Sequence, residues 1–197
     1  MTAPAASRTL SLQTQALLVF FCATAYFYAF KLNLYWFDWF EFSQGTNWIY
    51  IPSGLRLLFV LVLRGLGGLG VALSSIAVNY SFGDPEAHAF NIITGLISGA
   101  SPCLASYLCL HWFKLDTQLT NLNARVFLNV SILFALVNAL THQLWYFWTG
   151  RTENFLTSTA VMMVGDWFGT VLVLASLGLL LRWLKSAVAK VKANTTK

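Results

Sequence analysis

The apolar stretch Trp48–Tyr80 constrains the fold of this chain more than any other segment. It is almost wholly apolar over 33 residues, yet it carries Pro52 and Arg56 near its start. Four glycines lie near its middle: Gly65, Gly67, Gly68 and Gly70. A single helix of this length would be about 50 Å long, whereas the hydrocarbon core of a bilayer is about 30 Å thick. Because glycine lets backbones approach and a turn inside lipid must be shielded, we predict two short helices joined by a tight glycine turn at Arg64–Gly70. A re-entrant pair of helices stays open as an alternative with the same topology.

The composition predicts that the rest of the chain is also helical and embedded in a membrane. Of the 197 residues, 57% are hydrophobic and 10% are charged, whereas a soluble domain has about 25% charged residues. The apolar runs are continuous and do not alternate with a period of two, which argues against a β-barrel. We therefore predict an all-α integral membrane fold: a six-helix transmembrane bundle in which spans two and three are the short, glycine-turned pair.

The expected spans divide the chain into three parts. We predict a cytoplasmic N-terminal tail over residues 1–12, a six-span membrane domain over residues 13–184 and a basic cytoplasmic tail over residues 185–197. The spans are expected at residues 13–30, at two helices within 48–80, and at 89–113, 126–148 and 156–184.

Two segments near the N-terminus have competing interpretations. Span one is also a candidate signal peptide, because Ala23-Thr24-Ala25 resembles a cleavage site, although the apolar pattern continues past it. Residues 31–47 mix six aromatic residues with Asp38 and Glu41. Since Trp and Tyr gather at membrane–water interfaces, we expect this segment to lie along the outer membrane surface. An aromatic lid over a binding site is the alternative.

The distribution of Lys and Arg predicts that both termini are cytoplasmic. With six crossings, one side of the membrane collects most of the cations: Arg8, Arg64, Lys114, Arg125 and the tail residues Arg182, Lys185, Lys190, Lys192 and Lys197. The other side carries most of the carboxylates, and positively charged loops face the cytoplasm. We also expect the basic tail to continue the last helix and to contact anionic lipid or a partner.

No motif of an enzyme or a metal site stands out. The three cysteines and three histidines do not have the spacing of a zinc site or a disulfide framework: Cys22, Cys103, Cys109, His88, His111 and His142. The signatures of zinc proteases, α/β-hydrolases, P-loop proteins and dinucleotide-binding folds are absent from the sequence. We therefore expect no enzymatic activity, no cofactor, no metal and no nucleic-acid partner.

Two charged residues inside the spans mark the candidate site. Arg56 lies about eight residues below the outer end of span two and Asp166 about ten below that of span six, which places both roughly 12–15 Å deep. A lone charge at this depth costs about 2.5–3.5 kcal/mol, so we predict that the two form an ion pair. Asn138 and His142 share a helix face in the same outer half, and Asn91 lies at a similar level. These five residues predict a polar cavity that is open to the outside and binds a small ligand, and a purely structural brace is the alternative.

Two short motifs resemble a known family. Trp48-Ile-Tyr-Ile-Pro-Ser-Gly-Leu-Arg-Leu-Leu, followed by Arg64-Gly65, is similar to an early span pair of the bacterial membrane-associated sensor domain, the first family of that name (MASE type). Gly165-Asp166-Trp167-Phe168-Gly169 is similar to its late span, and Leu119-Thr-Asn-Leu also fits. The motif residues are Trp48, Pro52, Gly54, Trp167 and Gly169. The chain departs from the family at Ala175, where a proline is usual, in having fewer than the usual eight or so spans, and in lacking a fused kinase or cyclic-dinucleotide enzyme.

The resemblance implies a sensory input module, multi-pass in the bacterial inner (cytoplasmic) membrane, that acts through a partner signalling protein or a homo-oligomer. The function we expect is thus a non-enzymatic membrane module that binds a small ligand and signals to a partner. The alternative is a small solute-binding transport protein similar to the substrate-capture subunits of vitamin transporters, since six helices in a chain of this length also suit that class.

Overall fold

The computed structural model describes residues 10–43, 45–113 and 124–195, and this part of the chain is built almost entirely of six α-helices. They are α1 (Leu12–Phe37), α2 (Pro52–Leu63), α3 (Gly65–Phe82), α4 (His88–Trp112), α5 (Ala124–Trp148) and α6 (Phe155–Thr195). All except α2 are long and apolar enough to cross a membrane. The predicted all-α membrane bundle is confirmed. Predictions on Arg8, Lys114, Leu119–Leu122 and Lys197 concern positions outside the described residues.

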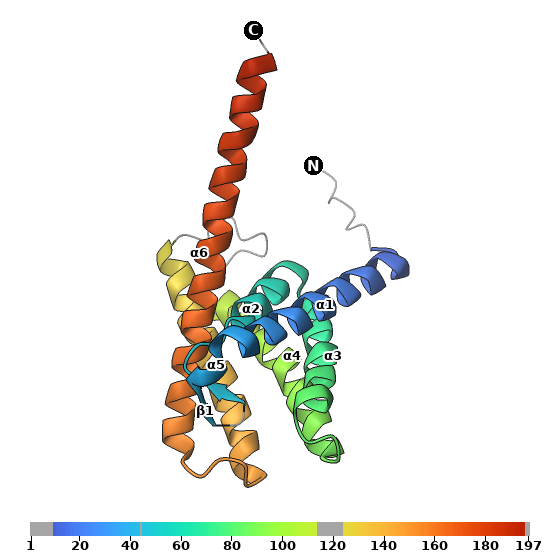
Figure 1. Cartoon of the computed structure of the whole chain (residues 1–197), viewed down its shortest axis with the longest axis vertical. Coiled ribbons are helices and arrows are strands. Elements are labelled where there is room, and N and C mark those ends of the chain that lie inside the picture. Colours follow the sequence, from blue (N-terminus) through green and yellow to red (C-terminus); the bar gives the residue numbers. More distant parts are fainter. Residues whose placement is uncertain (1–9, 44, 114–123, 196–197) are drawn as a thin grey trace, which may run out of the picture.

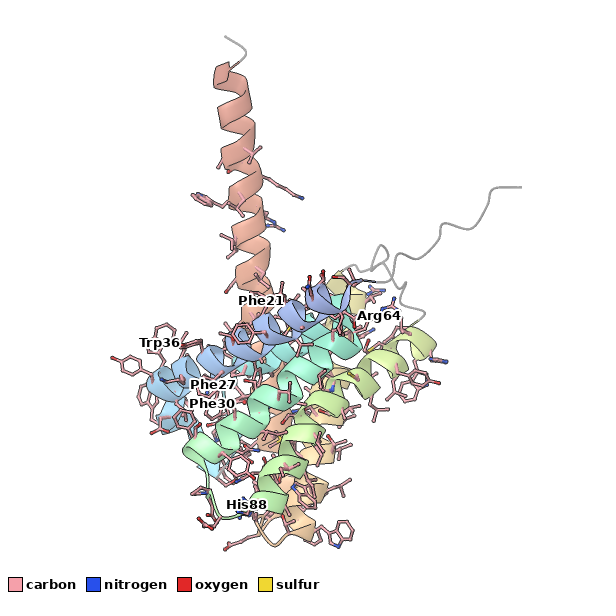
Figure 2. The ribbon with its side chains drawn as sticks, turned by 90° about the vertical axis from the view of Figure 1, so that its right-hand side faces the viewer. Phe21, Phe27, Phe30, Trp36, Arg64 and His88 are labelled. Atoms are coloured by element: carbon pink, nitrogen blue, oxygen red, sulfur yellow. The ribbon has the colours of Figure 1, made fainter. Side chains whose placement is uncertain are left out.

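Helix α2 occupies the centre of the bundle and contacts each of the other five helices. Around it, α3 packs between α1 and α4, α4 packs on α5, and α5 packs on α6. The N-terminal end of α1 lies at the same end of the bundle as the α2–α3 turn, and the loops after α3 and α5 lie at the opposite end (Figure 1). Figure 2 shows the same polarity, with Arg64 and His88 at opposite ends. Arg56, in the middle of α2, is thereby placed deep among the helices.

The predicted pair of short helices is present, with 12 residues in α2 and 18 in α3. Pro52 begins α2, where its missing N–H costs no helical hydrogen bond. The turn is shorter than the predicted Arg64–Gly70, because Arg64 alone separates the helices and adopts a positive φ of 52°. The glycines that follow lie inside α3, where they allow close helix contact: a Cβ on Gly68 would lie 2.5 Å from Cys103 Sγ, and one on Gly70 would lie 2.6 Å from Cys22 Cβ.

Most of the described residues between 31 and 47 are exposed, as expected of a surface segment, but Asn33 and Thr46 are buried and the end of the segment enters the bundle. Residues 31–37 are the last turns of α1, followed by a short 3₁₀ helix η1 (Asp38–Phe40) and the antiparallel strands β1 (Glu41–Ser43) and β2 (Thr46–Asn47). Thr46 is fully buried and accepts a hydrogen bond from Gln143 Nε2 at 2.9 Å. Trp36 and Trp39 do stay exposed, as expected for interfacial residues.

The physical reason for this insertion is the shortness of α2, which is about 18 Å long and therefore leaves the outer half of its path unfilled. The chain from β2 to Pro52 fills that space beside α6. Gly165 and Gly169 make room for it, because a Cβ on either glycine would overlap the carbonyl group of Asn47 or Tyr50. Non-helical backbone at membrane depth is stable only where protein shields it, and here Tyr50 N donates to the carbonyl of Gly165 at 3.2 Å.

The half of the bundle nearer the α2–α3 turn is filled by apolar side chains. They are Leu57, Ala105, Cys109, Val130, Phe134 and Val137, contributed by α2, α4 and α5. Helix α1 runs without a break through Ala23–Ala25 and packs Cys22 and Tyr26 against Val71 of α3. The polar side chains of the core therefore collect in the other half of the bundle.

Helix α6 is 41 residues long, about 60 Å, and its C-terminal part projects beyond the other helices (Figure 1). Side chains on this projection are exposed: Leu179 and Trp183 by 65% each and Val188 by 56%. The prediction that the basic tail continues the last helix is confirmed as far as Thr195.

Candidate functional site

Arg56 is held by two tyrosines. Its guanidinium donates to the hydroxyl of Tyr26 through Nε and Nη2, at 2.8 and 2.5 Å, and to the hydroxyl of Tyr50 through Nη2, at 3.2 Å. Its charge lies over both rings, 5.3 and 5.1 Å from their centroids. Because each ring presents a negative face, the tyrosines stabilise the cation by hydrogen bonds and by cation–π contact.

Tyr50 lies in the segment between β2 and α2, and its hydroxyl also bonds that of Tyr26 at 2.9 Å. The phenol thus acts beside Arg56 as a hydroxyl that accepts from the guanidinium and shares a hydrogen bond with Tyr26.

Asn138 of α5 connects the two buried charges. Its Oδ1 accepts from Arg56 Nη1 at 3.2 Å, and its Nδ2 donates to Asp166 Oδ2 at 2.5 Å. The predicted direct ion pair is therefore wrong: within the described part of the chain, no ion pair joins Arg56 to Asp166. An amide carries both a donor and an acceptor, so Asn138 satisfies both charges at once, while the other bonds of Arg56 go to tyrosine.

His142, one turn after Asn138, belongs to a chain of hydroxyl groups. Its Nδ1 bonds the carbonyl of Asn138 at 2.9 Å and its Nε2 bonds Ser98 Oγ at 3.0 Å. Ser75 donates to the same Ser98 oxygen at 2.9 Å. Since a carbonyl only accepts, Nδ1 carries a proton, and in the neutral ring Nε2 accepts from Ser98. The run of bonds joins α3, α4 and α5.

Asn91, near the start of α4, secures the loop at the outer end. Its Nδ2 donates to the carbonyl of Asp84 at 2.7 Å, and its own carbonyl accepts from Asn79 Nδ2 at 3.0 Å. These bonds explain why a polar residue is 2% exposed at this position. Asn91 therefore braces the rim of the site.

A cavity of about 350 Å³ brings the predicted residues together. Arg56, Asn91, Asn138, His142 and Asp166 all line it. The same wall reaches exposed residues at the outer end of the bundle, including Asp38, Glu41 and Asp84. The cavity therefore runs from the rim to the buried charges.

Most motif residues act in packing. Gly54 faces α6, where a Cβ would lie 2.6 Å from Val173 Cβ and 3.0 Å from the carbonyl oxygen of Gly169. Ser53 adds a hydrogen bond to the carbonyl of Asp166 at 2.7 Å. Trp48 is 45% exposed, and the buried N–H of Trp167 has no partner among the described residues. The two motifs thus pack against each other and hold the start of α2 on α6.

Sequence reasoning missed the hydroxyl groups that complete the site. Tyr26, Tyr50, Ser98 and Ser101 all take part, Ser101 by donating to Asn138 Oδ1 at 2.6 Å. The sequence did contain a signal for them, since several hydroxyl side chains lie in apolar spans at the level of a buried charge. A buried hydroxyl normally has a hydrogen-bond partner, so these residues were candidates for contact with that charge. Within the described residues, no group of three or more His, Cys, Asp or Glu side chains could hold a metal ion.

Compared with models of known protein families, with curated proteins and with solved structures, the chain shows no match.

Proposed function

We propose that this protein is a non-enzymatic sensory module of a membrane, which binds a small polar ligand in the outer cavity and signals to a partner protein. The observation that carries the proposal is the continuity of α6. This helix contributes Asp166 to the cavity wall and continues without a break to Thr195, beyond the other helices. Any tilt or shift of α6 at the cavity is thereby transmitted to its projecting end.

The cavity has the properties of a ligand site. Its volume of about 350 Å³ lies in the range of about 300–1,000 Å³ that is typical of small-molecule pockets. Polar groups from all six of the described helices converge on it, and buried ionisable residues inside a membrane usually serve a function. A small polar molecule entering from the outer end would meet Asp166, Asn138 and His142.

The packing below the cavity favours binding over passage. The apolar cluster around Phe134 and Leu57 fills the half of the bundle nearer the α2–α3 turn. A solute crossing the bundle would have to displace these side chains, whereas a solute that only binds leaves them in place. For this reason we prefer a sensor to a transport protein.

We place the module in a bacterial inner membrane with both termini in the cytoplasm. The location rests on the resemblance to membrane-associated sensor domains. The orientation rests on the charge distribution: Arg64 at the α2–α3 turn and the basic projection of α6 lie at the end of the bundle that carries the start of α1 (Figure 1).

The test combines binding with a readout at the far end of α6. The full chain in lipid nanodiscs is screened by thermal unfolding against a panel of small cations, anions and neutral solutes. Any solute that stabilises the protein is then added during hydrogen exchange, which is followed over residues 178–195. We expect a stabilising solute to change exchange in this projection.

Two variants of α3 test whether the stabilising solute binds in the cavity. Val78 is buried and lines the cavity, so Val78→Phe fills part of it and should abolish stabilisation. Leu73 is 49% exposed on the same helix and does not line the cavity, so Leu73→Phe is the matched control. Binding without any change in α6 would contradict signalling, and accumulation of the solute in proteoliposomes would identify a transport protein.

A further inference from the structure

Asp166 has one carboxylate oxygen that is not used by the protein. The residue is 1% exposed, and Oδ2 accepts from Asn138. Among the described residues no group donates to Oδ1, and this oxygen is not sealed inside protein, since Asp166 lines the cavity. A carboxylate oxygen only accepts hydrogen bonds, so this position requires a donor from whatever occupies the cavity.

The nearby cation does not supply that donor. Four of the five N–H groups of Arg56 are directed to Tyr26, Tyr50 and Asn138, all of them neutral. The carboxylate of Asp166 therefore receives a single hydrogen bond within the described residues, from the amide of Asn138. A charged donor makes a shorter and stronger bond to a carboxylate than a neutral donor does, so a cation satisfies Oδ1 best.

The rest of the wall also favours a cation. It contains four carboxylates (Asp38, Glu41, Asp84 and Asp166) against two arginines (Arg56 and Arg151). Arg151 is itself engaged, since its Nη2 lies 4.0 Å from Asp84 Oδ2 and its guanidinium lies 4.0 Å from the ring centroid of Phe90. An excess of negative charge along a cleft draws cations inward and raises their local concentration.

Aromatic rings complete the lining. Phe30, Phe82 and Tyr146 border the cavity, as do Tyr50 and Phe90, whose rings already contact Arg56 and Arg151. Ring faces attract ammonium groups, with greater effect where water is excluded. Wall charge, rings and the open oxygen of Asp166 thus favour the same chemical class.

We propose that the ligand is a small organic cation whose protonated amine donates to Asp166 Oδ1. This inference rests on the proposed function, because it names the class of molecule that the sensory cavity binds. The carboxylates at the rim attract the cation, the rings flank it, and Asp166 fixes its ammonium group.

The experiment compares probes of similar size on the full chain in nanodiscs. Ethanolamine carries an ammonium group, ethylene glycol is neutral and glycolate is an anion. We expect ethanolamine to raise the melting temperature in a saturable way, and the other two to leave it unchanged. Stabilisation by glycolate in place of ethanolamine would assign the cavity to anions and overturn the inference, while leaving the proposed function intact.

Variants test the role of each carboxylate. Asp166→Asn keeps the acceptor for Asn138 but removes the charge, so the Kd for ethanolamine should weaken at least about tenfold. Glu153→Gln is the matched control, since Glu153 is exposed at the same end of the bundle and does not line the cavity. Should Asp166→Asn fail to fold, the exposed pair Asp38→Asn and Glu41→Gln serves in its place and should weaken ethanolamine binding while reducing its salt dependence. An unchanged Kd in the folded variants, or no response of the wild type to ethanolamine, would refute the inference.

Discussion

At the residue scale, the site contains two opposite charges, and each of them is hydrogen-bonded to neutral side chains instead of to the other charge. Arg56 bonds to phenols and an amide, and Asp166 bonds to the same amide. The desolvation penalty of burying two charges exceeds the free energy of their attraction unless their hydrogen-bonding groups also have partners. The tyrosines and Asn138 meet that condition, so the arrangement depends on groups that carry no charge.

Removing one phenol hydroxyl should therefore destabilise the fold. Tyr26→Phe removes the hydroxyl that accepts hydrogen bonds from Arg56 Nε and Nη2. It leaves these buried donors without a partner, which should lower the free energy of unfolding by about 1–3 kcal/mol. Tyr28→Phe is the control, because Tyr28 is 60% exposed on the same helix. Thermal unfolding in detergent should show a lower melting temperature for Tyr26→Phe, and equal values for both variants would contradict the role of Tyr26.

A double-mutant cycle should show that the two charges are coupled although they do not touch. Arg56→Leu or Asp166→Leu alone strands the remaining charge and should cost about 3–5 kcal/mol. The double change removes both charges and should cost less than the sum, with a coupling of about 0.5–3 kcal/mol. Folded yield and denaturation in mixed micelles measure the cycle. Additive effects would mean that Asn138 transmits no interaction between Arg56 and Asp166.

At the scale of elements, the contact between α2 and α6 depends on glycine. The segment before α2 reaches its depth because Gly165 and Gly169 leave room for the carbonyls of Asn47 and Tyr50. That segment carries Tyr50, one of the two phenols that hold Arg56. The packing of backbone against backbone on α6 therefore determines where the cation is held.

Gly169→Ala tests this contact. The added methyl group would overlap the Tyr50 carbonyl and should cost about 1–3 kcal/mol, with loss of any ligand binding. Gly178→Ala is the matched control on the same helix, since a Cβ there meets nothing within 4 Å. Alanine is also the better helix former, so this control should be as stable as the wild type or up to about 1 kcal/mol more stable. If Gly169→Ala melts at the wild-type temperature, the segment before α2 can shift to accommodate the methyl group without loss of stability.

The sequence was sufficient for the helices and for five residues that line the cavity, but not for the hydroxyl groups that complete the site or for the contacts between side chains. Apolar run lengths predicted every helix, and depth alone placed Arg56 and Asp166 at one level. The depth of two residues in the membrane does not show which side chain lies between them, so the hydrogen bonds from Asn138 to both charges were not predicted. Interfacial composition likewise could not show that Thr46 is buried, because the space it fills exists only once α2, α5 and α6 are assembled.

At the scale of the whole molecule, polar and apolar residues divide the bundle into two halves. Cavity and charges occupy the half with the loops after α3 and α5, and the cluster around Phe134 fills the other. Helices α3, α4, α5 and α6 pass from one half to the other, and α6 continues beyond the bundle (Figure 1). A signal that starts in the polar half must therefore pass along helices, for which α6 offers the longest path.

The predicted orientation can be tested directly. Reporter fusions after Lys197 and within Asp84–His88 should report opposite sides of the membrane, with the C-terminus in the cytoplasm. The basic residues Arg182 and Lys185 on the projection of α6 favour that side. If both fusions reported the same side, the six-crossing topology would be refuted.

The burial of Thr46 and Tyr50 also has a consequence for the order in which the protein is made. The segment before α2 leaves the ribosome before its neighbours Gln143, Gly165 and Gly169 exist. Until α5 and α6 have been synthesised, the 12-residue α2 has neither the length to cross a bilayer alone nor its final contacts. The final contacts of α2 with α5 and α6 therefore form only after the last helix has been synthesised. A chain released before α6 would hold Arg56 with Tyr26 and Asn138 but without the surface of α6 that positions Tyr50 beside it.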